Sequence, residues 1–149
     1  MTHKQKIYQH LLQIVNEKIA LYEQVLADLK ESGANETKST AGDKHETSLA
    51  MLQIEQSNNR TQLNEVFAKK ALLEKINPIN TASVVLNGSL VKTNQGIFYL
   101  SIALGKVIVE EMQVFTISPQ SPLGQKLMGL RVGDEVNMNT YNYLILSIS

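Results

Sequence analysis

Hydrophobic residues recur at helical spacing through the first part of the chain. They form two neighbouring rows, one of Ile7, Leu11, Ile14, Leu21 and Val25 (with Lys18 in register) and one of Leu12, Val15, Ile19, Tyr22, Leu26 and Leu29. Rows at this spacing make one broad apolar face on a long helix. About 30 residues at 1.5 Å each predict a helix of roughly 45 Å.

A second helix is predicted from a similar pattern further along. Its apolar seam repeats at intervals of three and four residues, through Leu49, Leu52, Gln56, Asn59, Leu63, Val66, Lys70 and Leu73. The polar residues in the middle predict a weak or register-setting seam there. Between the two helices, the polar stretch KESGANETKSTAGD (30–43) predicts an exposed tip. Two helices of similar length joined in this way predict an antiparallel coiled-coil hairpin.

The remaining sequence is rich in strand formers. Short runs such as VVL, LVK, IFYLSIAL, KVIVEEM, QVFTI and YNYLILSI alternate with turn residues. One stretch differs: Ser121 can cap a helix, Pro122 suits its first position and Gly129 suits its end. The pattern therefore predicts an α+β protein, in which the hairpin is followed by a small antiparallel sheet with one short helix.

Charge divides the chain in the same way. Residues 1–77 hold 20 of the 28 charged side chains, whereas residues 78–149 hold all three prolines and six of the eight glycines. The residue before a proline avoids the α region, so Asn77–Pro78 is the predicted boundary. We therefore expect two domains, residues 1–77 and residues 78–149.

Composition excludes several classes of protein. The formal net charge of zero argues against a general nucleic-acid binder, and the absence of cysteine excludes disulfides and thiolate zinc sites. No apolar run approaches the roughly 20 residues that span a bilayer, and the N-terminal residues lack the apolar core of a signal peptide. We expect a cytoplasmic protein with no membrane partner.

Common enzyme motifs are absent from the sequence, and one acidic pair stands out. Asp43 and Glu46 are three residues apart where the second helix is predicted to start, a spacing that places both on one helix face. Two carboxylates at an exposed tip can hold a hard cation such as Mg²⁺, weakly unless another protein adds ligands. The same pattern is also a capping box, so a purely structural role for Asp43 and Glu46 stays open.

The segment SPQSPLGQKLMGLRVGDEV, residues 118–136, resembles the C-terminal domain of the GreA/GreB transcript-cleavage factors, in which SPLG and GDEV occupy a short helix and the following turn. Val84–Val91 resembles the family's V.FGS.V strand. At the tip, Gly42, Asp43 and Glu46 match the family's GD..EN motif, with Thr47 in place of the asparagine. The resemblance implies an N-terminal coiled coil followed by an FKBP-like domain.

The resemblance also implies a function. Gre factors insert their hairpin into the secondary channel of bacterial RNA polymerase, and their tip acids help to hold a catalytic Mg²⁺ so that the polymerase cleaves backtracked RNA. By this resemblance Asp43 and Glu46 are the catalytic and metal-binding residues. The Mg²⁺ is shared with the polymerase and the nascent RNA 3′ end lies nearby. The protein is then a monomer that assists another enzyme and is not itself an enzyme.

Three alternatives remain at this point. Thr47 and the following Ser48–Ala50 depart from the family pattern, which suits a Gre-fold regulator that occupies the channel without cleavage. The β-rich half could act as a prolyl isomerase or chaperone-type module, although Phe98, Tyr99, Phe115, Tyr141 and Tyr143 sit mostly at alternating strand positions typical of a core. The hairpin could also serve only for dimerisation.

Overall fold

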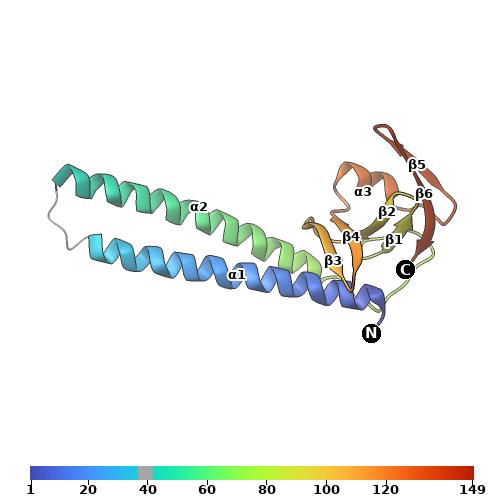
Figure 1. The fold of residues 1–149 in the computed structure, drawn as a ribbon, viewed down its shortest axis with the longest axis horizontal. Helices are drawn as coiled ribbons and strands as arrows, with labels where there is room; N and C mark the ends of the chain where they lie inside the picture. The colour runs from blue at the N-terminus through green and yellow to red at the C-terminus, as the bar shows by residue number, and fades with distance from the viewer. Residues whose placement is uncertain (37–41) are drawn as a thin grey trace. The chain divides into compact units, whose positions relative to one another are not determined.

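The computed structural model describes residues 1–36 and 42–149, with the backbone alone for residues 35, 36 and 42–45. Two long helices come first, α1 (His3–Glu36) and α2 (Gly42–Glu74). They are followed by β1 (Leu90–Thr93), β2 (Gly96–Leu100), β3 (Gly105–Val109), β4 (Met112–Ile117), α3 (Pro122–Leu127), β5 (Glu135–Met138) and β6 (Tyr141–Ile148) (Figure 1). The predicted class, a helical pair followed by a mostly antiparallel sheet with one short helix, is confirmed.

The chain forms two compact units in space. One unit is residues 13–70, which holds most of both long helices, and the other joins residues 1–12 to residues 71–149. We call them the hairpin unit and the β unit. The start of α1 thus belongs to the same compact unit as the sheet. The domain boundary at Asn77–Pro78 was inferred from amino-acid composition, and it stays a prediction.

In the hairpin unit, α1 and α2 run antiparallel beside each other (Figure 1). The seam predicted on α2 is confirmed, because each of its eight positions is buried or half-buried. The first row predicted on α1 is wrong at Lys18 and Leu21, which are exposed. The least exposed positions of α1 instead continue from Ile7 and Leu11 into the second row, through Val15, Ile19, Tyr22, Leu26 and Leu29. The second predicted row is therefore confirmed throughout, and Ile14 and Val25 of the first row are half-buried as well.

The predicted tip also needs a correction. Residues 30–36 were expected in the connection, but α1 continues through Gly33 to Glu36. Polar residues such as Lys30 and Glu31 are good helix formers, and a single glycine costs only about 1 kcal/mol. Nothing lies within 4 Å of where a Cβ would stand on Gly33, so the helix passes it without steric consequence. Residues 37–41 of the predicted tip lie outside the described residues, and its last two residues, Gly42 and Asp43, already belong to α2.

The sheet of the β unit has the strand order β3-β4-β2-β1-β6-β5. All neighbours are antiparallel except β2 and β4, which pair in parallel with Phe98 opposite Phe115. The β3–β4 hairpin folds back so that β4, and not β3, lies next to β2. The expected antiparallel sheet therefore contains one parallel pair. The predicted strand over residues 84–86 forms only a bridge from Val84 to Arg131.

The core of the β unit lies between the sheet and α3. Its buried residues come from distant parts of the chain: Val85, Val91, Phe98, Leu100, Leu127, Val136 and Ile145. Leu123 and Leu130 pack against this cluster with Leu127, which confirms that one face of the predicted short helix is apolar. Each large apolar side chain removed from water contributes about 1.5–3 kcal/mol, so this cluster contributes substantially to the stability of the unit.

Candidate functional site

The acidic pair lies at the start of α2. The helix begins at Gly42, so Asp43 is its second residue and not the residue that caps it. Asp43 and Glu46 are both helical and three residues apart, which places the two positions on one side of the helix. The side chain of Asp43 lies outside the described residues. That of Glu46 is exposed to solvent.

Metal binding by this pair is a prediction that the geometry leaves untested. Among the side chains that are described, no group of three or more histidines and acids lies close enough to hold a metal ion. Asp43 is not in that set. A helix N-terminus favours nearby carboxylates through its dipole, so the position suits acids with or without a cation.

The segment from Ser118 to Gly124 is held by a dense set of hydrogen bonds. The Ser121 hydroxyl accepts from the backbone N–H of Gly124 (3.1 Å) and donates to the carbonyl of Ser118 (2.7 Å). The Ser118 hydroxyl accepts from the N–H of Gln120 (3.1 Å). A Cβ on Gly124 would stand 2.2 Å from the Ser118 carbonyl oxygen, so only glycine fits there. The predicted Ser121 cap is confirmed, and the turn is rigidly defined.

The turn after α3 is fixed by an acid. The Asp134 carboxylate accepts from the backbone N–H of Arg131 (2.8 Å), and the Asp134 N–H donates to the Arg131 carbonyl (3.0 Å). Gly133 has a φ of +93°, which a side chain rarely tolerates. The GDEV motif is therefore structural at Asp134, since its carboxylate closes a turn.

The start of α1 contacts the sheet and its connections through charged and aromatic side chains. Lys6 forms an ion pair with Glu110 in the β3–β4 turn, with Nζ–O distances of 3.0 and 3.1 Å. The buried Tyr8 has a raised pKa because burial and the carboxylate of Glu74 both disfavour the phenolate. Burial, and then Tyr8, raise the pKa of Tyr99, whose hydroxyl has no hydrogen-bond partner in the described structure.

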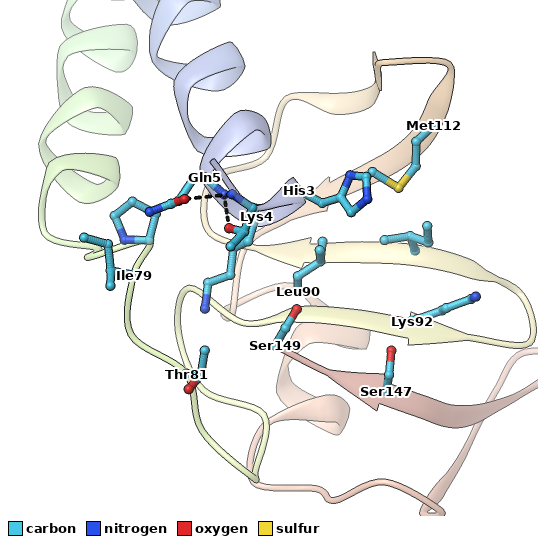
Figure 2. Close-up of a pocket in the computed structure, with 13 residues that line it drawn as sticks. His3, Lys4, Gln5, Ile79, Thr81, Leu90, Lys92, Met112, Ser147 and Ser149 are labelled. Carbon is cyan, nitrogen blue, oxygen red and sulfur yellow. Dashed lines mark hydrogen bonds between the residues drawn. The ribbon is translucent and has the colours of Figure 1, made fainter.

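A cavity of about 470 Å³ opens between the start of α1, the segment after α2 and the sheet (Figure 2). Its apolar lining comes from Pro78, Ile79, Leu90, Ile97 and Met112, and its rim carries His3 and Lys92. No acid lines it among the residues described. The cavity can accept an apolar body, but it lacks the acid–base pair that a hydrolytic or transfer reaction needs.

The aromatic residues form a cluster on the sheet. Phe98 stacks on Phe115 with ring centroids 5.4 Å apart and meets Tyr143 edge-on at 5.8 Å. Phe98 and Tyr99 are buried, as predicted for core residues, whereas Tyr141 is 56% exposed. The prediction that these aromatics belong to the core is thus wrong for Tyr141, which lies next to the β5–β6 turn.

Sequence reasoning missed Lys4. Its side chain is only 5% exposed, and its ammonium group donates to the backbone carbonyl of Asn80. Burial lowers the pKa of this lysine because the charged form loses hydration. The available signal was its spacing: Lys4 lies three and seven residues before Ile7 and Leu11, at the start of the apolar face of α1.

Comparison with known proteins identifies the class of the C-terminal part. Residues 107–149 match the family model described as "Transcription elongation factor, GreA/GreB, C-term". This segment covers β4, α3, β5, β6 and most of β3, and it contains the Ser121 and Asp134 turns. Residues 107–149 are therefore similar to the C-terminal domain of GreA/GreB factors, in agreement with the resemblance read from residues 118–136.

One solved structure, described as "Structure of the transcription factor Gfh1", is similar over most of the chain. The match has 18% sequence identity, covers 95% of this chain and 90% of that chain, and has a TM-score of 0.30. A search of curated proteins finds no match. No helix in the described part of the chain is both long enough and apolar enough to cross a membrane.

Proposed function

We propose that this protein is a Gre-like transcription elongation factor that binds bacterial RNA polymerase at its secondary channel and stimulates cleavage of backtracked RNA. The observation that carries the proposal is the GreA/GreB C-terminal domain at residues 107–149. In the same chain a long helical pair carries Asp43 and Glu46 where α2 begins. The proposed location is the cytoplasm, where the polymerase acts.

The length of the helices supports delivery of the acids to a buried site. The part of α1 that lies in the hairpin unit, residues 13–36, corresponds to about 36 Å at 1.5 Å per residue. A helical pair of this length can carry its turn deep into a narrow channel. Because α2 starts one residue before Asp43, both acids lie at the leading end of the helix rather than along its side.

The chemistry proposed for the pair is metal assistance. Carboxylates of Asp43 and Glu46 would supply oxygen ligands to a Mg²⁺ that the polymerase also holds, which is the ligand type this cation prefers. A second metal at a phosphoryl-transfer site stabilises the attacking and leaving oxygens. The protein would thus complete the polymerase's active site and would not catalyse alone.

A second function keeps the same partner without cleavage. Thr47 and Ser48–Ala50 differ from the family pattern next to the acidic pair. If these changes remove the geometry that the metal needs, the protein occupies the channel and modulates transcription. The two functions share the binding site and differ only in the chemistry at the tip.

The two functions can be separated on the host's RNA polymerase. Competition with a known secondary-channel ligand reports binding, and RNA shortening in stalled complexes reports cleavage. Glu46→Ala should reduce cleavage while leaving competition within about twofold, because Glu46 is exposed and supports no packing. Glu65→Ala, an exposed acid further along α2, is the matched control and should change neither readout. Competition without RNA shortening would favour the regulator. If the protein shows neither competition nor RNA shortening, both functions are excluded.

A further inference from the structure

The buried ammonium group of Lys4 has unused hydrogen-bond capacity. A lysine ammonium carries three donors, and in the described structure Lys4 uses one of them, on the Asn80 carbonyl. No carboxylate in the described residues pairs with it. A buried charge without a counter-charge is unfavourable, so this position is one where an anion would be stabilising.

Lys4 lies in the wall of a second, smaller cavity of about 210 Å³. This cavity shares Lys4 and Thr81 with the larger one, and the rest of its lining comes from residues 75–89, which follow α2. Lys75 provides a second cation and is exposed, with no ion pair in the part of the chain that is described. None of the described residues that line the cavity is acidic. Two cations without an acid give it a positive potential.

Neutral donors complete the lining. The hydroxyl of Thr81 and the side-chain amide of Asn87 both line the cavity, and neither has a hydrogen bond within the described structure. Figure 2 shows the Lys4 ammonium group pointing toward Thr81 and away from Leu90 and Lys92. Lys4 and Thr81 line both cavities, so a ligand in the smaller cavity lies beside both residues.

The loop that forms the far wall is already in a fixed conformation. The Leu86 N–H donates to the Ser89 hydroxyl (2.9 Å), and the Ser89 N–H donates to the Leu86 carbonyl (3.0 Å). Gly88 has a φ of +91°, and a Cβ there would stand 2.8 Å from Cγ2 of Ile76. A wall that is fixed before binding lowers the entropy that a ligand must overcome.

We propose that this cavity binds a phosphate group, either as free inorganic phosphate or as the phosphomonoester of a small molecule. Lys4 and Lys75 supply the charge, and Thr81 and Asn87 supply neutral hydrogen bonds. A lysine ammonium group binds phosphate as a point charge and, unlike an arginine guanidinium group, needs no fixed bidentate geometry. Two lysines can therefore contact a tetrahedral anion from different directions. A water occupies about 30 Å³ of liquid, so the cavity has room for a phosphate ion with some of its hydration.

The test is a titration of the ¹⁵N-labelled full chain with sodium phosphate at constant ionic strength, followed by amide chemical shifts. The amides of Thr81, Asn87, Gly88 and Ser89 should shift and saturate. Chloride at the same ionic strength should shift none of them. A parallel titration with adenosine monophosphate distinguishes the two sources: tighter binding than inorganic phosphate indicates a phosphomonoester, and equal binding indicates the free ion.

Matched variants assign the site. Lys75→Gln should weaken phosphate binding at least tenfold, whereas Lys92→Gln, which removes an equally exposed lysine from the larger cavity, should change it less than twofold. Lys4→Met removes the buried charge. If that variant fails to fold, Lys4→Arg, which keeps the charge, is measured in its place. The proposal is overturned if the four amides show no saturable shift, or if Lys92→Gln weakens binding as much as Lys75→Gln does.

Discussion

The hairpin unit and the β unit obtain their order in different ways. In the described residues, the hairpin unit has three buried apolar residues, Val15, Ile19 and Val66, and the β unit has seventeen. The helices of the hairpin are formed by local hydrogen bonds, whereas the sheet joins strands from distant parts of the chain. Stability is therefore concentrated in the β unit, which bears the family resemblance. The acids proposed for function lie on the element with little core.

This contrast indicates where substitutions are tolerated. A unit with a thin seam can vary its surface at low cost, because few side chains depend on one another. The β unit cannot vary as freely, because its turns depend on particular glycines and on a helix cap. Substitutions of the same kind in the two units test this contrast.

The largest effect is expected from removing a core side chain. Leu100 is fully buried in the β unit, so Leu100→Ala should destabilise that unit by about 3 kcal/mol through lost burial and a residual cavity. Leu21→Ala makes the same chemical change on the hairpin, where Leu21 is 61% exposed, and should cost less than about 0.5 kcal/mol. Urea denaturation followed by tyrosine fluorescence measures both. Equal losses would contradict the contrast.

A glycine substitution should have opposite signs in the two units. Gly124→Ala forces a Cβ against the Ser118 carbonyl and should cost about 2 kcal/mol or more. Gly33→Ala places the same methyl group in open space on α1 and should stabilise the helix by about 1 kcal/mol. Thermal unfolding followed by circular dichroism compares the two. Destabilisation by Gly33→Ala would show that the helix does not continue through that residue.

Loss of the α3 cap should have an intermediate effect. Ser121→Ala removes the acceptor for the Gly124 N–H and should cost about 1 kcal/mol. Ser121→Thr keeps both the acceptor and the donor to Ser118, so it should recover most of the loss. The free energy of unfolding from urea melts gives the values. If threonine recovers nothing, the hydroxyl is not the stabilising group.

The smallest effect is expected at the polar part of the α2 seam. Asn59 is half-buried and donates to the Glu55 carbonyl of its own helix. Asn59→Leu should stabilise the hairpin unit by about 0.5–1 kcal/mol, since it adds apolar burial at a seam position. Hydrogen exchange of α2 amides measures the gain, and sheet amides serve as the internal control. Faster exchange in α2 would mean that the polar seam is itself stabilising.

Much of the fold could be predicted from local patterns. The α2 seam and the Ser121-capped helix follow from spacing and capping chemistry that act within a few residues. The path of the α1 seam could not be predicted, because Lys18 and Leu21 fit the first row in sequence and only packing against α2 decides which row is covered. The parallel β2–β4 pair was missed for a similar reason, since strand order depends on long-range pairing.

The site was predicted unevenly. Asp43 and Glu46 were found from a local motif, and their role stays a prediction because it depends on a partner. Lys4 and Lys75 were missed as a pair, because 71 positions separate them in sequence and only the fold places both at one cavity. A lysine in register with an apolar face is easily taken for a solvated side chain, as Lys18 in fact is.

We propose that the acidic pair at the start of α2 supplies metal ligands for RNA cleavage. The measurement is the rate of 3′-fragment release from backtracked complexes of the host polymerase with Mg²⁺, for the wild type and for Asp43→Ala/Glu46→Ala. We predict that the wild type accelerates release. The acceleration by the double variant should be at least about 100-fold smaller, since metal assistance contributes several kcal/mol. Undiminished acceleration by a folded double variant would contradict the claim.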